Sequence, residues 1–156
     1  MTAARPEPAI VFVGYNAAFL RAIDEHLPRG AVVVLEEPDI IHKRDLANAP
    51  AGFQCLDRIV TAKYHQSAEA LETGIELAGA RPVAAVVPGL EYAVPSAAAL
   101  AAKLGLPGAG EQAALALRDK IRLREVSAAG AYATRVGRRH TARPTSSPSP
   151  PAGRWC

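Results

Sequence analysis

Four short apolar runs within the first ninety residues constrain the fold of this chain most strongly. The runs are residues 9–13, 31–35, 57–61 and 83–87, the third being less apolar than the others. Continuous apolar runs of this length, bounded by turn residues, are typical of strands buried in a sheet. The segments between them space their apolar residues as helices do: 17–27, 39–47 and 67–78. Connections this long exclude hairpins, so the alternation predicts right-handed crossovers and a parallel sheet covered by helices on both faces.

The predicted architecture is therefore α/β, a Rossmann-like three-layer domain with a helical extension and a disordered tail. The expected divisions are a flexible N-terminus, the Rossmann-like domain, a helical segment and the tail: 1–8, 9–110, 111–130 and 131–156. Asp39 and Ser67 are the expected N-caps of the second and third helices. The residues of the third helix expected to point inward are Ala70, Leu71, Gly74, Ile75 and Ala78.

The lengths of the apolar runs and the placement of the cysteines indicate the cellular compartment of the protein. No apolar run approaches the roughly 18 residues that span a bilayer, and the first residues lack the apolar core of a signal peptide. The two cysteines, Cys55 and Cys156, form neither a metal spacing nor a disulfide framework. Cys55 is expected to be a small buried residue. We therefore expect a soluble cytoplasmic protein with no membrane partner.

The charge is divided unevenly along the chain. Residues 1–130 hold all 15 acidic side chains and 13 basic ones, whereas 131–156 hold five Arg and no acid. The tail is rich in Pro and poor in apolar periodicity, which predicts disorder. We favour a reading-frame change or a truncated gene as its origin. The rival hypothesis is a basic tail that contacts nucleic acid phosphates, a partner that we do not favour.

Ligands of parallel α/β sheets bind at the carboxyl ends of the strands, which places candidates at 14–16, 36–39 and 88–92. Gly14 occupies the first strand-to-helix turn, but the second and third glycines of a dinucleotide fingerprint are missing. Glu36 or Glu37 stands about 20 residues further on, where a ribose-binding acid would be. These features are weak support for an NAD site, and the plainer interpretation is that Gly14 permits the turn.

Other reactive side chains do not form a recognisable site. The four His share no ligand spacing, and the glutamates at 69, 72 and 76 are typical of a solvated helix face. Ser96 follows Pro95 without a nucleophile elbow around it, so it is interpreted as a helix-start residue. Asp119 is an expected N-cap, which would put Lys120 and Arg122 in the first helical turn. A Lys beside free N–H groups at a helix N-terminus can bind an anion.

A longer pattern adds a family resemblance. Five pieces follow one another in order: Glu91, 97–101 (AAALA), 104–108 (LGLPG), 118–120 (RDK) and 128–130 (AAG). Together with the preceding Rossmann-like half, they resemble the start of an ATP-grasp ligase. The amino-acid ligase and carboxylate–amine ligase branches are the most similar. Residues 9–110 would then be the pre-ATP-grasp domain, and 111–130 the beginning of the ATP-grasp domain.

The resemblance implies ATP and Mg²⁺ as cofactors, and small-molecule carboxylate and amine substrates. It implies that Lys120 contacts ATP, with Gly14 and Glu91 as further cofactor-binding positions. The family reaction activates a carboxylate as an acyl phosphate for attack by an amine, with Mg²⁺ and basic residues neutralising the phosphoryl group. Many relatives are dimers, so a homodimer is a further expectation.

This sequence departs from the family pattern after Gly130. The second nucleotide-binding Lys, the Gly-rich loop and the Glu and Asn ligands of Mg²⁺ are not found in it. We therefore expect an N-terminal ligase fragment that is inactive alone, without an assigned catalytic or metal-ligating residue. The alternatives are a non-catalytic Rossmann-type nucleotide- or ligand-binding module and nucleic-acid binding through the tail.

Overall fold

A computed structural model describes residues 7–130, and its centre is a four-stranded sheet in which all neighbouring strands are parallel. The strand order is β3-β2-β1-β4. The strands are β1 (Ala9–Val13), β2 (Val32–Glu36), β3 (Leu56–Thr61) and β4 (Val83–Pro88). Each predicted apolar run became a strand, displaced by one residue at most. The predictions for residues 1–6 and for the tail lie outside the described residues.

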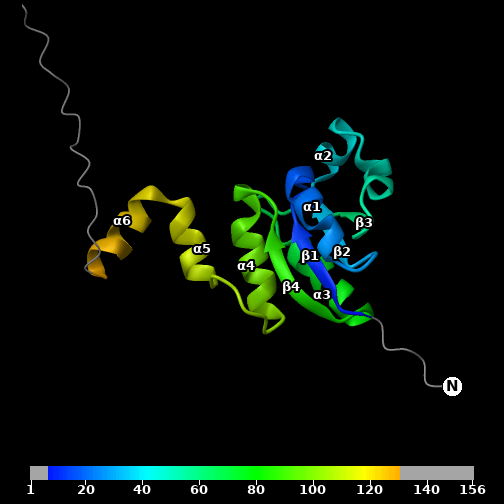
Figure 1. The fold of residues 1–156 in the computed structure, drawn as a ribbon. Helices are drawn as coiled ribbons and strands as arrows, with labels where there is room; N and C mark the ends of the chain where they lie inside the picture. The colour runs from blue at the N-terminus through cyan, green and yellow to red at the C-terminus, as the bar shows by residue number, and fades with distance from the viewer. Residues whose placement is uncertain (1–6, 131–156) are drawn as a thin grey trace, which may run out of the picture.

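Helices connect the strands and continue beyond them (Figure 1). The α-helices are α1 (Ala17–Ile23), α2 (Pro38–Lys43), α3 (Glu69–Ala80), α4 (Val94–Lys103), α5 (Glu111–Arg118) and α6 (Lys120–Ala129). The short 3-10 helices are η1 (Asp24–His26), η2 (Leu46–Gly52) and η3 (Glu91–Ala93). Within 7–130 no helix has both the length and the apolarity that crossing a bilayer requires.

Two apolar cores lie on opposite faces of the sheet and make the domain three-layered. On one face, Phe12 and Val34 pack with Leu20 of α1 and with the apolar side chains of α2. On the other, alternate strand residues pack with Ala70 of α3 and Leu100 of α4. Successive side chains of a strand point to opposite faces, so a strand without polar residues supplies both cores. The α/β prediction is confirmed.

Some predicted helix details were wrong. The second helix begins at Pro38 and has Glu37 rather than Asp39 as its N-cap, because the fixed φ of proline suits the first helical position. It ends at Lys43, four residues before the expected end. The third begins at Glu69 with Ala68 as N-cap, although the Ser67 hydroxyl accepts a hydrogen bond from the Glu69 N–H at 3.2 Å.

The inward face of α3 is also narrower than predicted. Ala70 and Gly74 are its buried residues, whereas Ile75 is 37% exposed. A Cβ atom at Gly74 would lie 2.4 Å from a methyl carbon of Leu100. The missing side chain at Gly74 therefore allows α4 to approach α3 closely.

The helical extension lies beyond α4, away from the sheet (Figure 1). α5 packs on α4, and α6 packs on α5 without burying any of its own residues. Asp119 is confirmed as the N-cap of α6: its Oδ1 accepts hydrogen bonds from the N–H groups of Ile121 (2.8 Å) and Arg122 (3.2 Å).

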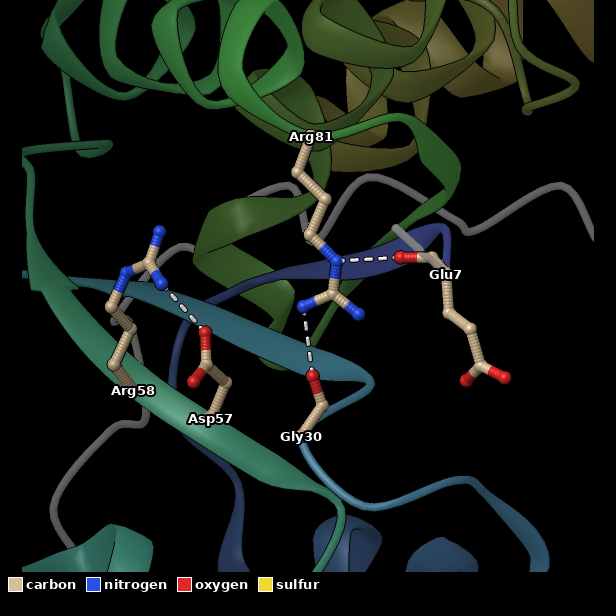
Figure 2. Close-up of polar contacts among 5 residues, drawn as sticks. All are labelled: Glu7, Gly30, Asp57, Arg58 and Arg81. Atoms are coloured by element: carbon tan, nitrogen blue, oxygen red, sulfur yellow. Dashed lines mark hydrogen bonds and ion pairs between the residues drawn. The ribbon is translucent and has the colours of Figure 1, made fainter. Parts of the chain in front are cut away.

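An arginine joins three segments at the amino edge of the sheet (Figure 2). Arg81, just before β4, donates from Nε to the carbonyl of Glu7 at 2.6 Å and from Nη1 to the carbonyl of Gly30 at 2.9 Å. Glu7 and Gly30 each stand two residues before a strand, β1 and β2 respectively. The amino ends of β1, β2 and β4 are thus tied together, and the carboxyl ends remain to form a site.

Candidate functional site

The turns after β1 and β4 contact each other at the carboxyl edge of the sheet. Gly14 directly follows β1 and has a φ of +90°, a conformation that favours glycine. A Cβ atom at Gly89, after β4, would lie 2.0 Å from the carbonyl oxygen of Gly14. Asn16 fixes the pair, since its Nδ2 donates to the carbonyl of Gly89 at 3.0 Å while its Oδ1 caps α1 by accepting from the Phe19 N–H. Gly14 therefore has a structural role in the turn; its cofactor-binding role stays a prediction.

A buried carboxylate lies beside these turns. Glu36 is fully buried at the end of β2. Its Oε2 accepts from the Tyr15 N–H at 2.6 Å, and its Oε1 accepts from the Glu37 N–H at 2.7 Å and from the Tyr64 hydroxyl at 2.8 Å. Glu36 is therefore not a ribose-binding acid: both oxygens are used inside the protein and no face of the carboxylate is open to a ligand.

The neighbouring Glu37 shapes the loop that follows β3. Its Oε1 accepts from the N–H groups of Tyr64 and His65, both at 2.8 Å. Burial, together with the hydrogen bond to Glu36, raises the pKa of the Tyr64 hydroxyl well above its usual range. The phenol thus stays protonated and keeps donating to Glu36, which holds the loop after β3 against the end of β2.

That loop forms one wall of a pocket of about 470 Å³, a volume ordinary for a small-molecule site. Residues of α5 and of the start of α4 also line it. The residues of this pocket that carry polar or aromatic groups are Tyr64, His65, Gln66, Ser67, Tyr92, Ser96, Glu111 and Arg118. The pocket lies at the N-terminal ends of α3 and α4, whose dipoles favour anions there.

Arg118 is the principal cation of this pocket. Its guanidinium carbon lies 4.8 Å from the centroid of the Tyr92 ring, and its Nη1 donates to the carbonyl of Glu91 at 3.2 Å. The Tyr92 and His65 rings are nearly perpendicular, with their centroids 6.0 Å apart. Stacking on one aromatic face and one hydrogen bond orient the guanidinium, and its other N–H groups make no hydrogen bond to the described residues.

Ser96 lies in the first turn of α4, the position expected from the sequence, and it makes a tertiary contact that the sequence did not predict. Its hydroxyl lines the pocket but donates to the carbonyl of Tyr64 at 2.7 Å. The bond ties the first turn of α4 to the loop after β3, so two walls of the pocket are held in a fixed relation.

The sequence-predicted site residues do not meet in this pocket. Lys120 is exposed at the first position of α6 and does not line it, and neither does Gly14. Glu91 reaches it only through the carbonyl that accepts from Arg118. Two N–H groups expected to be free at the start of α6 donate to Asp119, so the anion-binding capacity there rests on the Lys120 ammonium. The ATP role of Lys120 stays a prediction.

Sequence reasoning missed the pocket residues Tyr92, Glu111 and Arg118 as a group. One signal was available: Glu111 and Arg118 are seven positions apart, which puts them on one face of a helix. Nothing in the sequence shows that this face meets the loop after β3. Within 7–130, no three His, Cys, Asp or Glu side chains are arranged to hold a metal ion, so the described residues offer no Mg²⁺ site of that kind.

The fold is shared with a solved enzyme. An L-amino acid ligase from Bacillus licheniformis superposes with a TM-score of 0.65 at 17% identity, over 84% of this chain and 31% of the ligase. The chain thus spans about a third of that enzyme's length. No family model and no curated protein matches the sequence.

Proposed function

We propose that this chain is the N-terminal part of a ligase that joins a carboxylate to an amine at the expense of ATP, with 9–110 as its pre-ATP-grasp domain and 111–130 as the beginning of its ATP-grasp domain. The observation that carries the proposal is the superposition of most of this chain on an L-amino acid ligase. It agrees with the order of the five sequence pieces from Glu91 to Gly130, which resembles the amino-acid ligase branch.

The pocket supplies a place for the carboxylate substrate. Arg118 offers a planar pair of N–H donors, the geometry that matches a carboxylate best. Its guanidinium is already oriented by Tyr92 and by the Glu91 carbonyl. A substrate carboxylate would therefore find its main cation preorganised at the carboxyl edge of the sheet.

Lys120 is the residue of this chain that fits a role toward ATP. It begins α6, two positions after Arg118, and its side chain is exposed. An ammonium in that place can neutralise phosphate charge. ATP would supply the phosphoryl group that turns the carboxylate into an acyl phosphate, and the amine would then displace phosphate. The part of this chain is to bind and orient the carboxylate and to contact the nucleotide.

Calorimetric titration tests the proposal. We expect the chain to bind ATP–Mg²⁺, Lys120→Ala to weaken that binding about tenfold, and NAD to show no binding. Lys103→Ala, which removes an exposed Lys at the end of α4, is the matched control. A coupled assay with amino-acid mixtures is expected to show no ADP release by this chain alone. Tight NAD binding without ATP binding would indicate a dinucleotide-binding module and overturn the ligase proposal.

A further inference from the structure

The pocket beside α5 carries opposite charges at its two ends. Glu111 and Arg118 both line it and begin and end the same helix. Seven positions at about 1.5 Å of rise each separate their backbones by roughly 10 Å along the helix axis. A ligand that lies along α5 therefore meets a carboxylate at one end of the pocket and a guanidinium at the other.

The middle of the pocket is apolar. Leu115 lies between the two charges on the same face of α5, and it is 43% exposed because no side chain covers it there. Leu71 of α3 and the α4 residues Pro95 and Ala99 complete the apolar lining of the pocket. The surface that a ligand would cover between the charged ends is thus suited to aliphatic side chains.

Neither charge is neutralised by the residues around it. The ion pairs among the described residues join Glu25 to His26 and Asp57 to Arg58. Glu111 forms no side-chain hydrogen bond with them, and Arg118 donates only to the carbonyl of Glu91. Both therefore keep the capacity for a charge-assisted hydrogen bond to a ligand of opposite charge.

We propose that this pocket binds a short peptide of two or three residues with free termini. Its carboxylate would bind Arg118, its ammonium would bind Glu111, and its side chains would cover Leu115. An extended chain advances about 3.4 Å per residue, so about three residues match the roughly 10 Å between the two backbone positions, and two suffice where the Glu and Arg side chains bridge the rest. A single amino acid carries both charged groups on one carbon and spans far less of that length. The inference rests on the proposed function, because it names the carboxylate substrate of that site.

Calorimetry with the tripeptide Ala-Leu-Ala tests the inference on the full chain without nucleotide. We expect N-acetylation of the peptide and amidation of its carboxylate each to weaken binding about tenfold or more. In Glu111→Gln the penalty for N-acetylation should disappear while that for amidation remains. In Arg118→Gln the penalty for amidation should disappear while that for N-acetylation remains. A merely structural effect of either substitution would lower the affinity for all the peptides together.

Two exposed residues of α6 provide matched controls. Glu125→Gln and Arg124→Gln make the same chemical changes outside the pocket and should leave both penalties in place. Circular dichroism should show all four variants folded. Absence of tripeptide binding, or equal affinity for free and blocked peptides, overturns the inference. If ATP binds and amino acids bind but the tripeptide does not, only the inference fails; if the tripeptide binds and ATP does not, the ligase proposal fails instead.

Discussion

The phenol of Tyr64 donates a 2.8 Å hydrogen bond to the buried Oε1 of Glu36, a residue 28 positions earlier in the chain. This contact joins the end of β2 to the loop after β3. The same loop forms a wall of the pocket. The buried Glu36 thereby helps Glu37, which binds the N–H of His65, to hold this wall of the pocket in place.

We expect Glu36→Gln to lower the free energy of unfolding by about 2–4 kcal/mol. All three groups around the carboxylate are donors: the N–H of Tyr15, the N–H of Glu37 and the hydroxyl of Tyr64. The amide NH₂ of Gln is also a donor and would face at least one of these three groups, so two buried donors would be left without an acceptor. Urea unfolding measures the change, with Glu76→Gln on the exposed face of α3 as the control. A loss no larger than that of the control would contradict the prediction.

The Tyr64–Glu36 bond also predicts a pH dependence. Because the pKa of Tyr64 is raised in the folded protein, the folded state keeps this proton at pH values where the unfolded state loses it. The contribution of this group to stability is therefore complete below about pH 10, the ordinary value for tyrosine, and is lost as the pH rises above it. Tyr64→Phe should remove this part of the alkaline destabilisation.

Urea unfolding at pH 8 and at pH 10.5 measures the effect in the wild type and in Tyr64→Phe. Tyr92, which is 59% exposed, provides the control variant Tyr92→Phe, whose stability should fall with pH as the wild type does. An unchanged slope in Tyr64→Phe would show that the phenol ionises as readily in the folded state as in the unfolded one.

The fold was predictable because its signal is local. Three of the four strands are nearly continuous runs of apolar residues, which an amphipathic helix would not contain, and the turn residues beside each strand set its ends. The errors at Asp39 and Ile75 have non-local or competing causes. Pro38 took the first helical position, and the buried side of α3 at Gly74 is covered by Leu100, which lies 26 residues further along the chain.

The site was less predictable because it is assembled from distant segments. His65, Tyr92 and Arg118 come from three elements, and only their packing brings the two rings and the guanidinium together. Glu36 shows the same difficulty. Its position after a strand resembles that of a ligand-binding acid, and only the approach of Tyr64 shows that the carboxylate is used internally.

The two hydrogen bonds that Arg81 donates at the amino edge of the sheet should contribute measurably to the free energy of unfolding (Figure 2). We expect Arg81→Ala to lower the free energy of unfolding by about 1–3 kcal/mol, because it removes two hydrogen bonds from a charged donor to the carbonyls of Glu7 and Gly30. Arg58 provides the control. It pairs with its exposed neighbour Asp57, so Arg58→Ala should change stability by no more than about 0.5 kcal/mol. Equal losses of unfolding free energy in the two variants would show that the hydrogen bonds of Arg81 do not stabilise the sheet.

Cys55 should resist thiol reagents in the folded protein. Burial of the thiol raises the pKa of Cys55 to about 11, and its side chain is inaccessible. The thiolate is the reactive form. In a Cys156→Ser background we expect Cys55 to react at pH 8 at least about a hundredfold more slowly in buffer than in 8 M urea. Rapid labelling in buffer would mean that the core behind β3 opens readily.

The contact between the turns after β1 and β4 should not tolerate a methyl group at Gly89. A Cβ atom at Gly89 would meet the carbonyl oxygen of Gly14 at 2.0 Å, and both are backbone groups held by the ladder and by Asn16. Gly89→Ala must therefore displace one of the two turns, and we expect it to cost about 2–4 kcal/mol.

The matched control for Gly89→Ala is Gly79→Ala, in the last turns of α3. A Cβ atom at Gly79 would meet nothing within 4 Å, and alanine favours the helix over glycine by about 0.5–1 kcal/mol. The two Gly→Ala substitutions should thus shift the urea midpoint in opposite directions. Because Gly89 leads into the segment that carries Glu91 and Tyr92, Gly89→Ala should also weaken tripeptide binding, whereas Gly79→Ala should not. A stable Gly89→Ala variant would mean that the turns of β1 and β4 can separate without loss, and that Asn16 does not fix them at the carboxyl edge of the sheet.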